Sequence, residues 1–152
     1  KLVKKLVDAS NFNAGYACLR QVSFGLQDMA FHTITEPFNG NAVDMEVKST
    51  ARAQVLPNVL GTGRCTTFNH IFSGGYAAGY YSYKWAEVLD ADAFAMFKKN
   101  GIFDKKTATS FRKNILERGG TEHPMTLYKR FRGGEPTIDA LLIRNGIEPK
   151  KK

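Results

Sequence analysis

Apolar residues recur every three or four positions along much of the chain, which is the spacing of one face of an α-helix. The clearest case covers about Asn13 to His32. Its apolar stripe consists of Leu19, Val22, Leu26, Met29 and Ala30. The pattern predicts a helix that turns this stripe toward the core. The first residues repeat the pattern on a shorter scale and predict an amphipathic helix, whose apolar positions are Leu2, Val3, Leu6 and Val7.

Glycine, proline and capping residues divide the rest of the chain into further predicted helices. One runs from about Val43 to Val55, before Pro57 interrupts the pattern. Another begins after Asp104, whose side chain suits an N-cap, and stops at Gly119-Gly120. Both predictions follow from local residue preferences.

Two more helices are predicted toward the C-terminus. The first runs from Pro124 to about Phe131 and ends at Gly133-Gly134, and the second lies between Pro136 and Gly146. The residues of the second that are predicted to face inward are Ile138, Leu141 and Leu142. No stretch shows the alternation typical of a strand, so the sequence predicts an all-α fold.

The composition is that of one domain-sized unit. The chain has 152 residues, of which 43% are hydrophobic and 12% aromatic, which is enough to bury a core. We therefore expect residues 1–152 to form a single helical unit. Because the chain has no initiator Met and opens inside a predicted helix, we expect that unit to be a fragment of a larger domain. No run approaches the roughly 20 apolar residues that span a bilayer, and no secretion signal is recognisable.

The two cysteines, Cys18 and Cys65, lie far apart in the sequence and form no CxxC pair. Their spacing indicates neither a zinc knuckle nor a disulfide framework. Free thiols fit a reducing compartment, so a cytoplasmic location is expected.

The net charge of +8 is unevenly distributed along the chain. Residues 1–97 hold 8 basic and 8 acidic side chains, whereas residues 98–152 hold 14 and 6. A basic region of this kind is found in nucleic-acid-binding modules, which is one alternative for this protein. No zinc-finger or RNA-recognition signature accompanies the charge, and acidic residues are interspersed. We therefore interpret the lysines and arginines as solvated helix faces that keep the protein soluble.

The segment from residue 68 to 85 contains a histidine, two adjacent glycines and four tyrosines. Gly74-Gly75 follows His70 closely and forms a joint without side chains. Tyr76, Tyr80 and Tyr83 are spaced i, i+4 and i+7, which predicts phenols on one face of a helix that begins near Tyr76. This segment is the candidate site of chemistry.

Phenol hydroxyls grouped in this way suit acyl-transfer chemistry. A tyrosine with its ordinary pKa near 10 is neutral at pH 7. It can therefore donate a hydrogen bond to the negative oxygen that develops when a carbonyl is attacked. Two tyrosines and a histidine could form such an oxyanion hole. Aromatic residues at helical spacing are more often part of a packed core, so spacing alone does not establish a site.

The same segment resembles the thimet oligopeptidase family of zinc peptidases, which includes oligopeptidase A and the peptidyl-dipeptidases. The resemblance rests on His70, Gly74-Gly75-Tyr76, Tyr80-Tyr81-Ser82-Tyr83 and Trp85. Matches in the same order continue from Asp92 to Pro136 and reach back to Asn11-Phe12, so nearly the whole chain is covered. The stretch around Leu19-Arg20-Gln21 is more similar to oligopeptidase A than to the peptidyl-dipeptidases.

The resemblance implies the C-terminal, multi-helix portion of a zincin-like catalytic domain. Members of the family hold one zinc ion with an HExxH helix and a more distant Glu, and zinc-bound water attacks the peptide carbonyl. The chain lacks this motif, because its histidines, His32, His70 and His123, are too scattered for it. We therefore expect the HExxH part to lie upstream of residue 1. Zinc is expected in the parent protein and not on this chain, which alone should be inactive.

The resemblance assigns to this chain the opposite wall of the active site. It implies that Tyr76 and Tyr83 donate to the oxyanion or the substrate backbone, that His70 contacts the substrate carbonyl region, and that Tyr80 lines the groove. We hypothesise that the Gly74-Gly75 joint lets Tyr76 swing inward when substrate closes the cleft. The expected partners are short peptides and the upstream part of the same domain. The full-length protein is expected to be a monomer without nucleic-acid or membrane partners.

The shared wall leaves the cleavage mode open. A peptidyl-dipeptidase, which releases dipeptides from the C-terminus of its substrates, would carry the same residues as an endopeptidase. Most of residues 90–152 are expected to buttress the catalytic helices without taking part in the chemistry.

Overall fold

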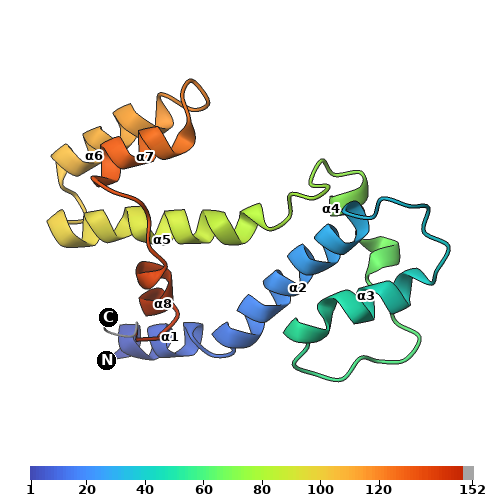
Figure 1. The fold of residues 1–152 in the computed structure, drawn as a ribbon. Coiled ribbons are helices and arrows are strands. Elements are labelled where there is room, and N and C mark those ends of the chain that lie inside the picture. The colour runs from blue at the N-terminus through green and yellow to red at the C-terminus, as the bar shows by residue number, and fades with distance from the viewer. Residues whose placement is uncertain (149–152) are drawn as a thin grey trace. The chain divides into compact units, whose positions relative to one another are not determined.

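The computed structural model describes residues 1–148, and every regular element in this part of the chain is a helix (Figure 1). The prediction of an all-α fold is therefore confirmed. The α-helices are α1 (Leu2–Ser10), α2 (Ala14–His32), α3 (Ala42–Thr50), α4 (Asn69–Phe72), α5 (Ser82–Asn100), α6 (Lys105–Phe111), α7 (Pro124–Arg132) and α8 (Asp139–Arg144). Two short 3₁₀ turns, η1 (Ala51–Ala53) and η2 (Cys65–Thr67), and one π-helical turn, η3 (Arg112–Leu116), complete the set. The terminal lysines Lys150 to Lys152, which contribute to the basic charge, lie outside the described residues.

The chain divides into two compact units, one comprising Lys1–Trp85 and the other beginning at Ala86. Helix α5 starts in the first unit and continues through the second. The prediction that residues 1–152 form one fragment of a larger catalytic domain stays a prediction. Within the described chain, none of the helices combines the length and the apolar character that crossing a membrane requires.

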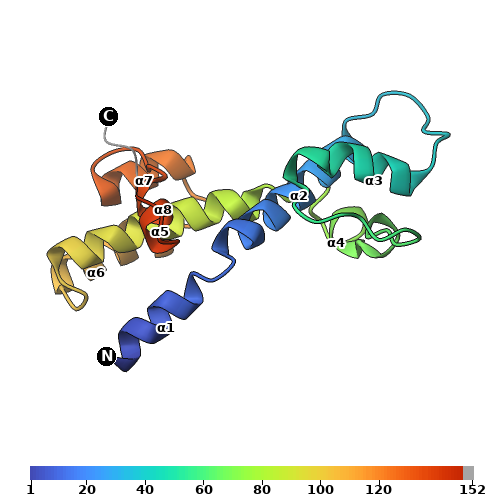
Figure 2. The same ribbon diagram turned by 90° about the horizontal axis from the view of Figure 1, so that it is seen from below.

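In the first unit, α2 and α3 lie side by side, as both Figure 1 and Figure 2 show. Asn41 caps the start of helix α3, and its side-chain oxygen accepts hydrogen bonds from the backbone N–H groups of Val43 at 2.8 Å and Asp44 at 3.2 Å. This satisfies two of the donors left free at a helix start. The predicted helix over 43–55 is thus confirmed, with its last turn tightened into η1.

The predicted helix over 13–32 exists as α2, but the prediction of its buried face was wrong. Leu19, Val22 and Met29 are exposed. Leu26 and Ala30 are half-buried. The buried face is largely polar and consists of Ser23, Phe24, Gly25, Gln27 and Asp28. Polar side chains can occupy this face because their hydrogen bonds are made within the fold, which removes the cost of burying them.

The second unit has an aromatic core formed by α5, α6, η3 and α7. Its buried members are Ala93, Tyr128 and Phe131, and the residues packed around them include Phe97, Phe111 and Ile115. The predicted start after Asp104 and both predicted ends of α7 are confirmed. The predicted stop at Gly119-Gly120 is not, because α6 ends at Phe111 and η3 at Leu116, and turns follow. Asp104 caps α6 by accepting the N–H of Thr107 at 2.7 Å. Helix α7 starts at Pro124 and ends at Gly133, whose φ of 84° is the left-handed conformation that glycine adopts without strain.

The last predicted helix is present as α8, with one correction to its inward face. Leu141 is buried against Val88 and Ala91, and Leu142 is half-buried, as predicted. Ile138 is 56% exposed. It lies at the N-cap, one residue before the helix begins, so helical spacing does not apply to it.

Candidate active site

The predicted site residues lie on three consecutive pieces of the first unit. His70 belongs to the short helix α4, Tyr76 and Tyr80 lie in the turns that follow it, and Tyr83 lies in the first turn of α5. The prediction that one helical face carries all three tyrosines was therefore wrong. Helix α5 begins only at Ser82, because the chain between Ser73 and Tyr81 is held in turns by contacts from other elements.

The turns nevertheless bring the four side chains into one group, which we call the His/Tyr cluster (His70, Tyr76, Tyr80 and Tyr83). Tyr83 contacts all three other rings, with centroid distances of 5.1 Å to Tyr76, 5.0 Å to Tyr80 and 5.7 Å to His70. His70 lies 4.8 Å from Tyr76 and 5.6 Å from Tyr80. The Nε2 atom of His70 and the hydroxyl oxygen of Tyr83 are 2.8 Å apart, which is a hydrogen bond.

The His/Tyr cluster is accessible from outside the chain. Tyr76 is 37% exposed and Tyr83 is 38% exposed. His70 is exposed as well, whereas Tyr80 is half-buried beneath them. Three of the four side chains are therefore exposed on the described chain, unlike the rings of a packed core.

The hydroxyl of Tyr83 is held in its neutral form. A hydrogen bond with the Tyr76 side chain is the largest cause, and burial and the neighbouring phenols add to it, raising the pKa of Tyr83 to about 12. A group with this pKa keeps its proton throughout the neutral range. Tyr83 is thus a neutral hydrogen-bond donor next to an imidazole.

Both glycines of the joint are required by the backbone geometry. A β-carbon on Gly74 would lie 2.6 Å from the carbonyl oxygen of His70, a distance that side chains do not tolerate. Gly75 has a φ of +82°, in the left-handed region that favours glycine. The two residues let the chain turn tightly against α4, which brings Tyr76 back over the His70 ring. A swinging motion of this joint stays a hypothesis.

Tyr80 packs against two further aromatic rings. Its ring makes edge contacts with Phe24 of α2 at 5.6 Å and with Phe68 at 5.3 Å. The guanidinium of Arg64 lies over Phe24 at 4.2 Å from the ring centre, and Arg20 lies over the same ring at 4.7 Å. Burial raises the pKa of Tyr80, while the two arginines oppose the shift.

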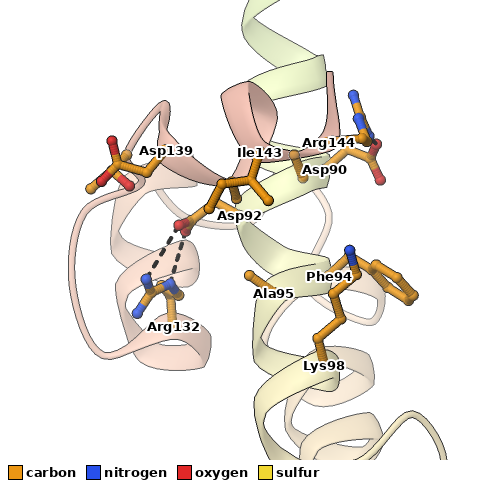
Figure 3. Close-up of a pocket in the computed structure, with 12 residues that line it drawn as sticks. Asp90, Asp92, Phe94, Ala95, Lys98, Arg132, Asp139, Ile143 and Arg144 are labelled. Atoms are coloured by element: carbon orange, nitrogen blue, oxygen red, sulfur yellow. Dashed lines mark hydrogen bonds and ion pairs between the residues drawn. The ribbon is translucent and has the colours of Figure 1, made fainter. Parts of the chain in front are cut away.

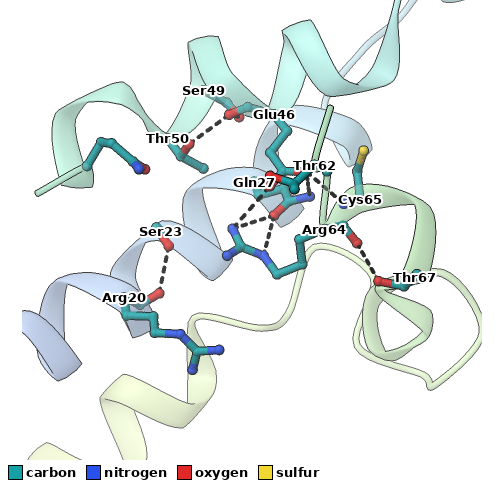
Figure 4. Close-up of polar contacts among 12 residues, drawn as sticks. Arg20, Ser23, Gln27, Glu46, Ser49, Thr50, Thr62, Arg64, Cys65 and Thr67 are labelled. Carbon is teal, nitrogen blue, oxygen red and sulfur yellow. Dashed lines mark hydrogen bonds and ion pairs between the residues drawn. The ribbon is translucent and has the colours of Figure 1, made fainter. Parts of the chain in front are cut away.

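A polar network fixes Arg64 beside the rings of Phe24 and Phe68 (Figure 4). The side-chain oxygen of Gln27 accepts hydrogen bonds from Nε and Nη2 of Arg64, at 3.0 and 2.8 Å. Glu46 of α3 accepts one from the backbone N–H of Cys65 at 2.7 Å and lies 3.7 Å from Arg64. Because Gln27 is completely buried, these bonds explain how α2 turns a polar face inward.

One residue that supports the site was missed by the sequence argument. Asp28 of α2 is completely buried and accepts hydrogen bonds from the backbone N–H groups of Ala78, at 2.9 Å, and Tyr80, at 2.8 Å. The Nδ1 atom of His32 lies 2.8 Å from the same carboxylate. The available signal was the His32 side chain one turn further along the predicted helix, but nothing local indicated a contact about 50 residues away.

The histidines have separate surroundings. His32 pairs with Asp28, His70 belongs to the His/Tyr cluster, and the Nδ1 atom of His123 accepts the N–H of Met125 at 3.2 Å at the start of α7. Between residues 1 and 148, no three His, Cys, Asp or Glu side chains come together in a way that could hold a metal ion.

The second unit contains a cavity of about 340 Å³ between α5 and α8 (Figure 3). Two ion pairs line it, Asp92 with Arg132 at 2.8 Å and Asp90 with Arg144 at 2.5 Å. None of the predicted site residues borders this cavity. Its charges compensate one another, which fits a structural role.

Comparison with known proteins gives a consistent family assignment. The model of peptidase family M3 matches residues 1–147. The chain is 47% identical to oligopeptidase A of Escherichia coli over 152 residues, which cover 97% of this chain and 22% of the relative. It is 42% identical to a probable cytosolic oligopeptidase A of Arabidopsis thaliana, covering 95% of the chain and 21% of the relative. A dipeptidyl carboxypeptidase of E. coli is 36% identical, with 97% and 22% covered. The chain spans about a fifth of the length of these curated relatives.

Proposed function

The chain belongs to peptidase family M3, and from this premise we propose that it forms a substrate-facing wall in the active site of a zinc-dependent oligopeptidase. The observation that carries the proposal is the exposed His/Tyr cluster, in which His70 and Tyr83 are hydrogen-bonded at 2.8 Å. The relatives named oligopeptidase A, at 42% and 47% identity, support the same class of activity. Short peptides are the proposed substrates.

In this proposal Tyr83 is the principal hydrogen-bond donor to the reacting carbonyl. Negative charge develops on the carbonyl oxygen in the transition state, and a neutral phenol that already points at it stabilises that charge. The raised pKa of Tyr83, about 12, keeps the proton on the phenol. His70 orients the hydroxyl through Nε2. Tyr76, stacked on Tyr83, is the second donor.

Zinc, when bound to the parent protein, would polarise the peptide carbonyl and activate water. Because the described chain lacks a ligand set, we propose that an HExxH helix and a further Glu upstream of residue 1 hold the ion. The Gly74-Gly75 joint and Tyr80 would shape the groove, and this chain alone would be inactive. The full-length protein is proposed to act as a cytoplasmic monomer.

The experiment that tests this function replaces Tyr83 with Phe in the full-length protein that carries this chain. Loss of one oxyanion donor lowers kcat by roughly 10²–10³-fold, measured on an internally quenched peptide. Tyr81→Phe is the matched control, because Tyr81 is 61% exposed and adjacent to the cluster without belonging to it. An unchanged kcat in Tyr83→Phe would remove Tyr83 from the mechanism.

The claim that the chain alone is inactive has its own test. The purified 152-residue chain is incubated with zinc and the same peptide. Turnover that a chelator abolishes would show that this chain carries a complete site and would overturn the proposal.

Release of dipeptides from the C-terminus is the second candidate function. It is supported by the 36% identity to a dipeptidyl carboxypeptidase, which is lower than the identity to the oligopeptidases. Mass spectrometry of the products separates the two activities. An endopeptidase cuts at internal bonds, whereas a peptidyl-dipeptidase shortens the peptide from its C-terminus two residues at a time.

Because of its ion pairs, the second unit supports nucleic-acid binding less well than it would if its basic side chains were unpaired. Several of its basic side chains form ion pairs, among them Arg132 with Asp92, Arg130 with Glu122 and Lys129 with Glu135. Paired cations release fewer counterions when they meet phosphate. Steeply salt-dependent retention on a nucleic-acid column would contradict this part of the proposal.

A further inference from the structure

A buried carboxylate on α2 holds the piece of backbone from which Tyr80 projects. The two oxygens of Asp28 accept separate hydrogen bonds, Oδ1 from the N–H of Ala78 at 2.9 Å and Oδ2 from the N–H of Tyr80 at 2.8 Å. The side chain has no exposed surface. The carboxylate therefore clamps both ends of a three-residue turn.

The turn that Asp28 holds has an unusual backbone conformation. Ala78 has a φ of +54°, in the left-handed region that residues with a β-carbon seldom adopt. Such a conformation persists only where surrounding contacts determine it. The hydrogen bonds to Asp28 are contacts of this kind, and they are strengthened because the acceptor is charged and shielded from water.

The position of this turn sets the position of Tyr80 within the His/Tyr cluster. The Tyr80 ring lies 5.0 Å from Tyr83 and 5.6 Å from His70. Its hydroxyl is 3.5 Å from the side-chain oxygen of Gln21, the limit of a hydrogen bond. Because that anchor at the tip of the side chain is weak, the ring is placed by its packing on Phe24 and Phe68 and by the backbone from which it projects.

His32 closes the remaining side of the carboxylate. Its Nδ1 atom is 2.8 Å from Oδ1 of Asp28 and 2.9 Å from the backbone oxygen of the same residue. The His32 ring also packs against Phe72 of α4, with centroids 5.5 Å apart. Both oxygens of Asp28 thus have polar partners, which fix the direction of the carboxylate.

We propose that Asp28 is a positioning residue for peptide hydrolysis, which acts by fixing the turn at Ala78–Tyr80 and so holding Tyr80 against the substrate groove. The inference rests on the function proposed above. It assigns an effect on turnover to a residue with no access to substrate, and it identifies Tyr80 as the side chain through which the effect passes.

The test is a double-mutant cycle in the full-length protein that carries this chain. Asp28→Asn keeps the shape of the side chain but turns an N–H group toward one of the two backbone donors. Activity is expressed per folded molecule, well below the unfolding temperature. A displaced contact of about 1 Å lowers kcat/KM by up to about 100-fold, so a loss of about 10- to 100-fold is expected. In a Tyr80→Ala background, Asp28→Asn should cost less than about 3-fold, because the effects of coupled residues do not add.

Asp92→Asn is the matched control, because Asp92 is the other almost completely buried aspartate within residues 1–148. Its partners are the side chains of Arg132 and Tyr128 in the second unit. It should change kcat/KM per folded molecule by less than about 3-fold in either background. If Asp28→Asn does not fold, Asp28→Ser, which retains one acceptor oxygen, replaces it in the cycle.

Two results would overturn the inference. One is a kcat/KM per folded Asp28→Asn molecule equal to that of Asp92→Asn, and the other is an equal loss in the presence and absence of the Tyr80 side chain. Both differ from failure of the proposed function, in which the unmodified full-length protein would not cleave peptides at all.

Discussion

Two groups of aromatic side chains, one in each unit, have similar ring spacing and opposite exposure. Ring centroids are 4.8–5.7 Å apart in the contacts of the His/Tyr cluster that involve His70 or Tyr83. In the second unit, Phe131 lies 5.1 Å from Phe111, 6.3 Å from Phe97 and 6.4 Å from Tyr128. Phe131 and Tyr128 are buried, whereas Tyr76 and Tyr83 are more than a third exposed. Ring contacts alone therefore do not distinguish a core from a site.

The difference between the groups lies in what their polar atoms contact. In the second unit the hydroxyl of Tyr128 is 2.7 Å from a carboxylate oxygen of Asp92, which also pairs with Arg132. The hydroxyl, the carboxylate and the guanidinium there contact one another. In the first unit the buried carboxylate of Asp28 binds backbone N–H groups, and the phenol of Tyr83 remains outside. One aspartate closes a core, and the other holds a surface turn in place.

The largest effect on stability is expected from breaking the hydrogen bonds among Asp92, Arg132 and Tyr128 in the second unit. Asp92→Ala removes the carboxylate from the Arg132 guanidinium and from the buried Tyr128 hydroxyl, which keeps only a long contact of 3.4 Å to the backbone oxygen of Leu89. Removing one member of a buried pair costs about 3–5 kcal/mol of unfolding free energy, measurable by urea denaturation of the 152-residue chain. A loss below about 1 kcal/mol would show that water replaces the carboxylate.

The same variant should show a characteristic pH dependence. Burial disfavours the charged form of Asp92, but hydrogen bonds from Arg132 and Tyr128 outweigh it and lower the pKa. A lowered pKa gives stability that is present above the unfolded-state value of about 3.9 and is lost as pH falls through the folded-state value. The stability difference between wild type and Asp92→Ala should therefore be constant at neutral pH and narrow below about pH 4.

A smaller effect, on the pH dependence of turnover, is expected from a change in the His/Tyr cluster of the first unit. Tyr76→Phe removes the hydrogen bond that is the main cause of the raised pKa of Tyr83, about 12. The pKa of Tyr83 should fall toward about 10. Tyr76→Phe also removes the proposed second donor, so kcat falls at every pH and is compared with its own value at pH 8. Because Tyr83 donates only while protonated, this normalised kcat of the full-length protein should then decline near pH 10, where that of wild type does not. A profile like that of Tyr81→Phe between pH 8 and 11 would contradict this.

These helices also show which features local sequence determines. The Asp104 cap and the Pro124 and Gly133 ends of α7 were predictable, because each depends on contacts within a few residues. The buried face of α2 was not, because Gln27 and Asp28 find their partners at Arg64 and Ala78, far along the chain. For the same reason the sequence predicted the members of the His/Tyr cluster but placed Tyr76 and Tyr80 on a helix that begins only at Ser82.

The smallest effect tests that correction directly. Val22 lies on the predicted apolar stripe of α2 and is 37% exposed. Val22→Ala should change the unfolding free energy of the 152-residue chain by no more than about 0.5 kcal/mol, as is usual at surface positions. Phe24→Ala, two residues away and buried, should cost about 3–5 kcal/mol. Equal losses of unfolding free energy in the two variants would show that the predicted apolar stripe of α2 is buried after all.

The tight backbone of the Gly74-Gly75 joint has a practical consequence for protein engineering. A library that aims to change the peptide preference of such an enzyme should leave Gly74 and Gly75 fixed, because a β-carbon on Gly74 would be 2.6 Å from a backbone oxygen and Gly75 has a φ of +82°. Diversity is better placed at Gly79, where a β-carbon would have its nearest neighbour at an ordinary 3.6 Å. Ala77, exposed in the same turn, is the second choice. New side chains at these two positions would flank Tyr80 without disturbing the backbone that carries it.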